Sequence, residues 1–163
     1  MNQNHKCLLL DRDGVINHDP GDYTCRIEEF VILPNVTKAI RIAKEKFYKI
    51  AIITNQGGIA KGLYTHDTVN QIHSYLQSEC EKEGGNIDVI LYSPHHPDHG
   101  NSLCRKPGHL WVQRALALMN GNPENSVMIG DRDRDIESAE AAGVKGILME
   151  KNGDLLSYIE SLP

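Results

Sequence analysis

Five short apolar runs recur along the chain and alternate with longer segments whose apolar residues repeat at helical spacing. Continuous apolar runs of this length are typical of strands that are buried on both faces of a parallel sheet. The runs predict strands over residues 8–10, 50–53, 87–92, 127–129 and 147–149.

The segments between these runs carry helix signals. A helix is expected to begin near Asn35, and Thr65 is expected to cap a long helix that ends at paired glycines. Two more helices are predicted over 108–119 and 136–142, and Asp154 can cap a terminal helix. Strands that alternate with helices predict a parallel sheet with right-handed crossovers, which is a Rossmann-like three-layer α/β sandwich.

The 163 residues contain no linker, repeat or low-complexity stretch, so we expect a single domain over residues 1–163. The loop over 18–29 and the other connections are too short to hold an inserted cap domain. A site at the end of the sheet is therefore expected to be open to solvent.

Composition limits the classes of partner and the compartment that we expect. The net charge is -5 and no block of Lys or Arg occurs, which argues against nucleic acid as the main partner. No apolar run reaches the length of a membrane span, and the polar first residues do not resemble a secretory signal. The four cysteines are dispersed and form no C-x-x-C pair, which fits a reducing compartment. We expect a cytoplasmic monomer, with Cys7 and Cys80 in its core.

Polar residues follow the predicted strands at their carboxyl ends, which meet at one edge of a parallel sheet. Carboxylates suit Mg²⁺, whereas a lysine, a hydroxyl and an amide suit phosphate oxygens. The set therefore predicts a phosphoryl-transfer site that uses Mg²⁺. Its members are Asp11, Asp13, Thr54, Asn55, Lys106, Asp131 and Asp135.

Each of these residues also has a plain structural interpretation. Asp11 and Asp13 alone describe an acidic turn after a strand. Asp135 is expected either to cap its helix or to orient Lys106. Because side chains alternate along an extended backbone, Asp11 and Asp13 are expected to face one side while Arg12 points elsewhere. The ordered set favours the phosphoryl-transfer site over the separate structural interpretations.

The order of the motifs resembles the haloacid dehalogenase superfamily. The motifs are D-x-D-G-V at 11–15, I-T-N at 53–55, Lys-Pro at 106–107 and G-D-x-x-x-D at 130–135. Within the superfamily, four segments are similar to the branch of heptose bisphosphate phosphatases, whose closest relatives are the histidinol phosphatases. These segments are 11–17, 54–62, 94–97 and 104–107.

This resemblance implies a phosphomonoesterase in which Asp11 attacks phosphorus and forms an aspartyl phosphate. Asp13 would protonate the leaving sugar oxygen and later accept a proton from water, which requires a protonated Asp13 when substrate binds. The Asp11 carboxylate, the Asp13 backbone carbonyl and Asp131 would hold Mg²⁺.

The implied catalytic set also contains Lys106, which would pair with Asp11 and with the phosphate. Thr54 and Asn55 would orient the transferring group.

The implied substrate is a heptose 1,7-bisphosphate that loses its 7-phosphate, and histidinol phosphate is the alternative. A catalytically silent phosphate-binding or interaction module is the alternative from a different class, although retention of both Asp11 and Asp13 argues against it. Basic residues near the expected mouth favour a bisphosphate. The predicted substrate-binding residues are Asn17, Asp19, Asn55, Gln56, Gly57, Lys61, Arg105 and Arg132.

The loop over 93–106 departs from the family pattern, which carries zinc on C-x-H followed by C-x-C. Two of the four ligand positions hold serine, and the four positions are Ser93, His95, Ser102 and Cys104. Neutral hydroxyls are poor zinc ligands beside thiolate and imidazole. We therefore expect a loop held by hydrogen bonds and proline stiffness, while His96 or His99 remain candidates for a rebuilt zinc site.

Overall fold

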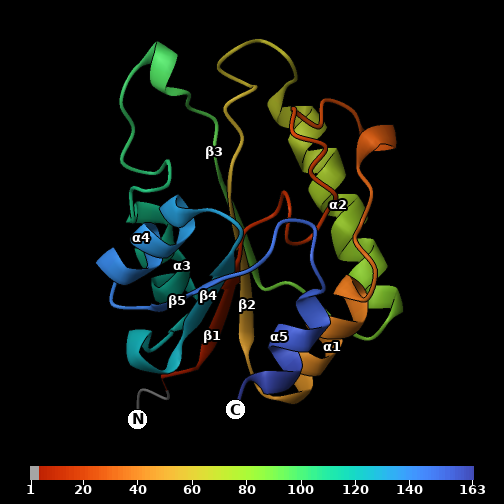
Figure 1. Ribbon diagram of the computed structural model, residues 1–163, viewed down its shortest axis with the longest axis vertical. Helices are drawn as coiled ribbons and strands as arrows, with labels where there is room; N and C mark the ends of the chain where they lie inside the picture. Colours follow the sequence, from red (N-terminus) through yellow and green to blue (C-terminus); the bar gives the residue numbers. More distant parts are fainter. Residues whose placement is uncertain (1–3) are drawn as a thin grey trace.

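The computed structural model describes residues 4–163, which form a parallel sheet of five strands between two layers of helices (Figure 1). The strand order is β3-β2-β1-β4-β5, so the first strand lies at the centre of the sheet. The predicted Rossmann-like three-layer sandwich is confirmed. The strands are β1 (Cys7–Leu10), β2 (Lys49–Asn55), β3 (Val89–Ser93), β4 (Val127–Gly130) and β5 (Lys145–Leu148).

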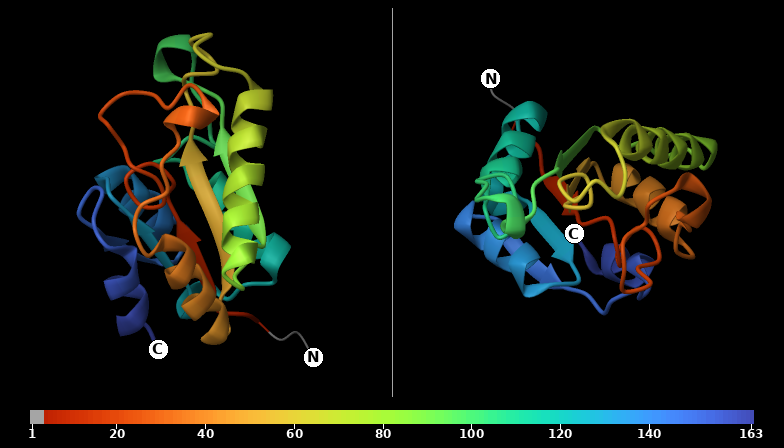
Figure 2. Two further views of the ribbon diagram at one scale, coloured as in Figure 1. Left: turned by 90° about the vertical axis from the view of Figure 1, so that its right-hand side faces the viewer. Right: turned by 90° about the horizontal axis from the view of Figure 1, so that it is seen from above.

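The helices divide unequally between the two faces of the sheet. Helices α1, α2 and α5 cover one face, and α3 and α4 cover the other (Figure 2). The helices are α1 (Val36–Glu45), α2 (His66–Lys82), α3 (Leu110–Met119), α4 (Asp133–Ala141) and α5 (Leu155–Ser161). Short 3₁₀ turns cover Ile27–Glu29, Pro97–His99 and Pro123–Asn125.

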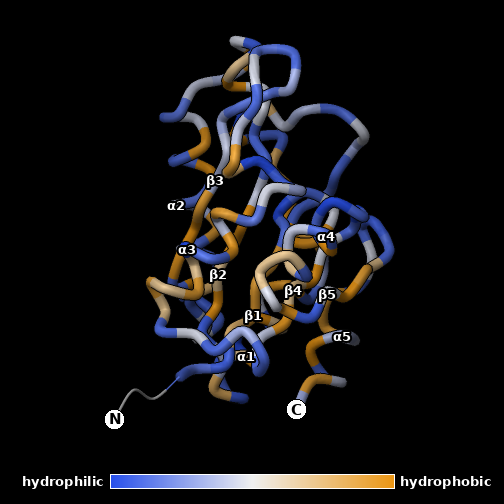
Figure 3. Tube along the Cα trace, turned by 90° about the vertical axis from the view of Figure 1, so that its left-hand side faces the viewer, coloured by the Kyte–Doolittle hydropathy of each residue, from blue (hydrophilic) through white to orange (hydrophobic). Residues whose placement is uncertain are grey.

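The central strand explains why the first apolar run is continuous. Leu8 and Leu10 pack into the core under α1, α2 and α5, whereas Leu9 packs into the core on the opposite face. Leu9 is in register with Ala51 of β2 and with Met128 of β4. Because both faces are covered, no position of this strand tolerates a polar residue. The polar segments gather above the strand ends instead (Figure 3).

Local signals in the sequence set the helix ends. The Thr65 side chain accepts a hydrogen bond from the Thr68 backbone N–H at the start of α2, as predicted. The Asp154 carboxylate accepts one from the Leu156 N–H at the start of α5, which confirms that cap as well.

Several element boundaries differ from the prediction by one to three residues. Strand β3 begins at Val89 rather than at 87. Helix α4 begins at Asp133 rather than at 136, because the Asp135 carboxylate accepts a hydrogen bond from the Arg132 N–H at 3.1 Å. Acidic residues in a first turn also favour the helix dipole, which extends α4 into the polar motif.

Cys7 and Cys80 are buried in the core as predicted, and all four cysteines are free thiols. Among residues 4–163, no helix is both long enough and apolar enough to cross a membrane.

Candidate active site

A buried lysine joins the ends of the central strands. Lys106 comes from the loop after β3, and its ammonium lies 2.8 Å from Asp11 Oδ1 and 2.7 Å from Asp135 Oδ1. It also donates a hydrogen bond to the Ile53 carbonyl at 2.7 Å. All three charged side chains are buried, so the ion pairs form in a medium of low dielectric. Asp135 thus caps α4 and also orients Lys106, which are the two roles that the sequence predicts for it.

A third carboxylate joins the two that pair with Lys106. Oxygens of Asp11, Asp131 and Asp135 lie within 4.8 Å of one another. Both carboxylate oxygens of Asp131 are buried without a hydrogen-bond partner, and the nearest cationic atom is Arg132 Nε at 3.5 Å. The cluster is therefore short of positive charge.

The electrostatics follow from burial. Burial raises the pKa of Asp11 to about 7 against the opposing effect of Lys106, and it raises the pKa of Asp131, with a further contribution from Asp135. The two carboxylates beside Lys106 outweigh its burial and raise its pKa, so the lysine stays charged. Unpartnered buried carboxylate oxygens are a donor set that suits a hard divalent cation such as Mg²⁺.

Glycine is required beside this cluster. Gly14 has a φ of 85°, and a Cβ built on it would lie 2.4 Å from Asp131 Oδ2. A side chain at position 14 would therefore occupy the space between the β1 loop and the β4 carboxylate.

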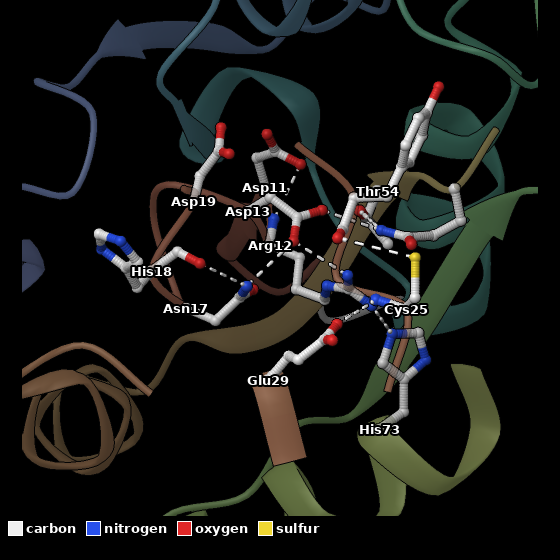
Figure 4. A network of polar contacts seen from close by, with 12 residues as sticks. Asp11, Arg12, Asp13, Asn17, His18, Asp19, Cys25, Glu29, Thr54 and His73 are labelled. Atoms are coloured by element: carbon white, nitrogen blue, oxygen red, sulfur yellow. Dashed lines mark hydrogen bonds and ion pairs between the residues drawn. The ribbon is translucent and has the colours of Figure 1, made fainter. Parts of the chain in front are cut away.

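Asp13 lies in a contrasting environment (Figure 4). Its Oδ1 accepts hydrogen bonds from Arg12 Nη2 at 2.9 Å and from Asn17 Nδ2 at 3.0 Å, and its Oδ2 accepts one from Gln56 Nε2 at 2.9 Å. Burial alone would raise the pKa of Asp13, but the Arg12 charge and these hydrogen bonds outweigh burial and lower it. Asp13 is therefore ionised in this state, whereas the sequence analysis requires a protonated Asp13 when substrate binds.

One expectation about these neighbours is corrected. Arg12 does not point away from Asp13 but is buried against it. Asn17 and Gln56, which the sequence predicts as substrate contacts, are buried and their amides bond to protein groups, so substrate binding by these two residues stays a prediction. Tyr64 completes the arrangement, because its hydroxyl donates to Gln56 Oε1 at 2.7 Å. These side chains hold Asp13 in place.

The polar residues at the end of β2 also make hydrogen bonds within the protein. Thr54 Oγ1 accepts a hydrogen bond from Gln56 Nε2 at 2.9 Å. Asn55 pairs twice with the backbone of Lys106: its Nδ2 donates to the Lys106 carbonyl, and its Oδ1 accepts from the Lys106 N–H, both at 3.0 Å. Asn55 thus fixes the loop that delivers the buried lysine.

An open cavity of about 280 Å³ lies over Asp13. Five predicted site residues line it: Asp13, Asp19, Asn55, Gln56 and Arg132. The sequence analysis missed Tyr23, Tyr64 and Arg134, which also line it. Spacing alone carries no signal for these three residues, because Tyr23 and Tyr64 come from loops whose paths only the fold defines and Arg134 lies in the first turn of α4.

Asp19 connects the cavity to the loop after β5. Its carboxylate lies 3.1 Å from Lys151 Nζ and 3.3 Å from Arg132 Nη2. Its backbone N–H donates to Asn152 Oδ1 at 2.7 Å, and Asn152 Nδ2 donates back to its carbonyl at 3.0 Å. Lys151 and Asn152 were also missed, although their place after a parallel strand puts them at the same sheet edge.

Three other predicted binding residues lie beside the cavity and do not line it. Arg105 Nη1 donates to the His95 carbonyl at 2.9 Å. Gly57 lies against this pair, since a Cβ on it would be 3.1 Å from the His95 carbonyl oxygen and 3.2 Å from Arg105 Nη1. The Lys61 ammonium lies 5.5 Å from the centre of the Tyr23 ring. Binding by these residues remains a prediction.

The loop that departs from the family pattern contains a small neutral cluster. Cys104 Sγ lies 3.0 Å from Ser102 Oγ and 3.4 Å from Ser93 Oγ. Three of the four expected zinc positions thus meet through hydrogen bonds of hydroxyl and thiol groups. Two hydroxyls in place of thiolates do not fit a zinc site.

Comparison with known proteins agrees with this geometry. A family model described as HAD-hydrolase-like matches residues 103–155. The D-glycero-beta-D-manno-heptose-1,7-bisphosphate 7-phosphatase of Haemophilus ducreyi is 33% identical over 93% of this chain and 86% of that protein. The enzyme of the same name from Helicobacter pylori is 39% identical over 91% of this chain and 85% of that protein.

A solved structure is similar over most of the chain. The D,D-heptose 1,7-bisphosphate phosphatase from B. bronchiseptica, complexed with magnesium and phosphate, has a TM-score of 0.84 and 31% sequence identity. The match covers 97% of this chain and 88% of that one. Similarity of this extent, together with the carboxylates and the lysine at the strand ends, shows that the chain belongs to the haloacid dehalogenase-like hydrolases and is a phosphatase.

Proposed function

We propose that this phosphatase is a Mg²⁺-dependent phosphomonoesterase that removes the 7-phosphate of D-glycero-D-manno-heptose 1,7-bisphosphate in the cytoplasm. The observation that carries the proposal is the buried pairing of Lys106 with Asp11 in a cluster of three carboxylates that has too few positive charges to balance them. The names of the relatives support the substrate.

Asp11 is the proposed nucleophile. A carboxylate needs no general base, and its attack on phosphorus gives an aspartyl phosphate. Lys106 would orient the Asp11 carboxylate and stabilise charge on the transferring oxygens, while Thr54 and the loop held by Asn55 border the same space. The cluster would hold Mg²⁺ through Asp11, Asp131 and the Asp13 carbonyl, and the bound metal would reduce repulsion between phosphate and nucleophile.

Asp13 is the proposed proton carrier. In the free protein its carboxylate is ionised, because Arg12, Asn17 and Gln56 all donate to it. The negative charge of a bound phosphate would raise the pKa of Asp13 and favour uptake of the proton that the leaving oxygen needs.

A bisphosphate fits the basic groups around the cavity. Arg132 and Arg134 line it, and Lys151 reaches its edge through Asp19. Histidinol phosphate, the alternative substrate, carries one phosphate and an amine, so it would leave these cations without an anionic partner.

The loop from Ser93 to Cys104 is proposed to fold without zinc. Its support is the hydrogen-bonded cluster of two hydroxyls and one thiol. The cation requirement of the enzyme would then concern the acidic cluster alone.

Phosphate release in the presence of Mg²⁺ tests the function. The values of kcat/KM for the heptose bisphosphate and for histidinol phosphate should differ in favour of the first, and the product should retain its 1-phosphate. Asp11→Asn should lower turnover by at least about 10³-fold, while the exposed control Asp67→Asn should leave it unchanged.

The alternatives predict other outcomes. Faster hydrolysis of histidinol phosphate would make the substrate assignment wrong. Equal release by the wild type and Asp11→Asn would remove Asp11 as nucleophile, and no release by either protein would favour a silent phosphate-binding module.

A further inference from the structure

Arg12 is a charged residue buried in the centre of the site. Its side chain is 1% exposed, although it lies between the two acidic residues of the opening motif. Its guanidinium donates to Asp13 Oδ1 at 2.9 Å and lies 5.5 Å from the centre of the Phe30 ring. A buried guanidinium is costly unless it is paired and hydrogen-bonded, so this arrangement needs a reason.

Helix α2 supports the guanidinium from behind. Arg12 Nη1 lies 3.4 Å from His73 Nε2 (Figure 4). Burial, and then the Arg12 charge, lower the pKa of His73 to about 3, so the ring is neutral and Nε2 can accept a hydrogen bond. The Tyr92 ring packs against His73 in a T-shaped arrangement with 5.8 Å between ring centres, which restricts the imidazole.

The Asp13 carboxylate is hydrogen-bonded to three side chains and also faces the cavity. Arg12 is the charged donor among its three partners, and the other two, Asn17 and Gln56, are neutral amides. The Asp13 side chain is 30% exposed and lines the cavity over the site. Two of the three contacts that set the direction of its carboxylate, those of Arg12 and Asn17, thus come from residues that do not line the cavity.

We propose that Arg12, supported by His73, is a positioning residue that aims the Asp13 carboxylate at the leaving oxygen of the substrate. This inference rests on the proposed function. It adds that α2 supports Asp13 indirectly: His73 of α2 contacts Arg12, and Arg12 contacts Asp13.

The chemistry gives this role a distinct signature. In the first step the bond between phosphorus and the leaving oxygen breaks, a bond to Asp11 forms, and the Asp13 proton moves to the leaving oxygen. In the second step water gives its oxygen to phosphorus and its proton to Asp13, and the bond to Asp11 breaks. A sugar alkoxide is a strong base and needs the Asp13 proton to leave, whereas p-nitrophenolate is a weak base and leaves without it.

The test compares two substrates in Arg12→Gln. Because kcat/KM reports only the steps up to departure of the leaving group, it isolates the proton donated by Asp13. For the heptose bisphosphate it should fall about 10²-fold, and for p-nitrophenyl phosphate it should change less than about threefold. Arg114→Gln, an exposed change on α3, is the matched control and should leave both values unchanged.

A pair of His73 variants keeps the inference testable if Arg12→Gln folds poorly. His73→Gln retains an acceptor for Arg12, and His73→Phe fills the space without one. His73→Phe should lower kcat/KM for the heptose bisphosphate several-fold more than His73→Gln does, with p-nitrophenyl phosphate hydrolysis nearly equal in the two variants.

The outcomes are separable. Equal losses with both substrates would mean that the variants displace Asp11, and they would overturn the positioning role while leaving the phosphatase function intact. Unchanged values with both substrates would overturn the role as well. A wild type that hydrolyses neither substrate in Mg²⁺ would overturn the proposed function together with this inference.

Discussion

The two carboxylates of the opening motif lie two residues apart in surroundings of opposite character. Around Asp11, two buried carboxylates share the ammonium of Lys106 while Asp131 lies in the same cluster without a hydrogen-bond partner, and burial raises the Asp11 pKa to about 7. Around Asp13, one carboxylate receives an arginine and two amides, and its pKa is lowered. One half of the site has fewer positive charges than carboxylates, and in the other half one carboxylate has three hydrogen-bond donors.

The contrast shows how one short motif separates two tasks. A deficit of positive charge provides a place for a metal ion and for the electrophilic phosphorus. A carboxylate held by fixed donors keeps its direction, which proton transfer requires. The difference arises from partners that other strands and helices supply, since the two residues themselves are chemically identical.

The largest expected effect comes from removing the cation of the Asp11 half. Lys106→Met leaves the buried carboxylates uncompensated, so we expect a loss of about 3–5 kcal/mol in the free energy of unfolding. A fall of about 10²–10³-fold in kcat should accompany it. Chemical denaturation and phosphate release measure these effects, with the exposed Lys38→Met as control. A Lys106→Met protein that is as stable as the wild type without Mg²⁺ would contradict the deficit of positive charge around Asp11.

A smaller effect comes from the support of the Asp13 half. The folded pKa of His73 is about 3, below its ordinary value near 6.5, so the unfolded chain binds a proton that the folded chain does not. Stability should therefore fall as the pH drops below about 6.5, by about 2 kcal/mol between pH 7 and pH 5 from this residue alone. His73→Gln should lack this part of the slope. Identical slopes in denaturant titrations would show that His73 takes up its proton as readily in the folded chain as in the unfolded chain, which would contradict a lowered pKa.

A further test uses magnesium and pH together. Because burial, with a smaller contribution from Asp135, raises the Asp11 pKa to about 7, the metal-free protein loses stability as the pH rises from about 4 to about 7 and the buried carboxyl group becomes charged. Magnesium offsets the cost of this buried charge, so the increase in Tm caused by Mg²⁺ should grow across the same range. A gain of about 1 kcal/mol corresponds to about 2–4 °C for a chain of this size. Asp131→Asn should reduce the increase in Tm caused by Mg²⁺. An increase that becomes smaller as the pH rises would contradict the expected direction.

The smallest effect is expected in the loop that carries Lys106. Wild type purified without chelator should contain no stoichiometric zinc. Ser93→Cys with Ser102→Cys should bind about one zinc ion per chain, because it restores four soft ligands with His95 and Cys104. Either serine changed alone should bind zinc weakly. Stoichiometric zinc in the wild type would show that other side chains complete a site.

The sheet and its functional edge could be predicted because their signals are local. An apolar run such as 8–10 reports a strand buried on both faces, and parallel topology then brings strand ends such as Asp11 and Asp131 to one edge. The helix caps at Thr65 and Asp154 were equally readable, since a cap involves residues two or three positions apart.

The roles of the polar side chains could not be predicted in the same way. Gln56 meets Asp13 across 43 residues, and Asn55 meets Lys106 across 51. An amide near a strand end has the right chemistry for a phosphate and for a protein carboxylate alike, so only the fold decides between them. Alternation also failed at Arg12, because the strand ends before it and the backbone turns there.

The double hydrogen bond between Asp19 and Asn152 can form only late in synthesis of the chain. The two residues are separated by 133 positions, and ribosomes add about 5–20 residues per second. During synthesis, Asn152, which holds the Asp19 loop in place, is therefore added roughly 7 to 27 s after Asp19. The mouth of the site is completed by a loop made long after Asp11 and Asp13, so a nascent chain that already holds these two residues cannot yet present a finished cavity.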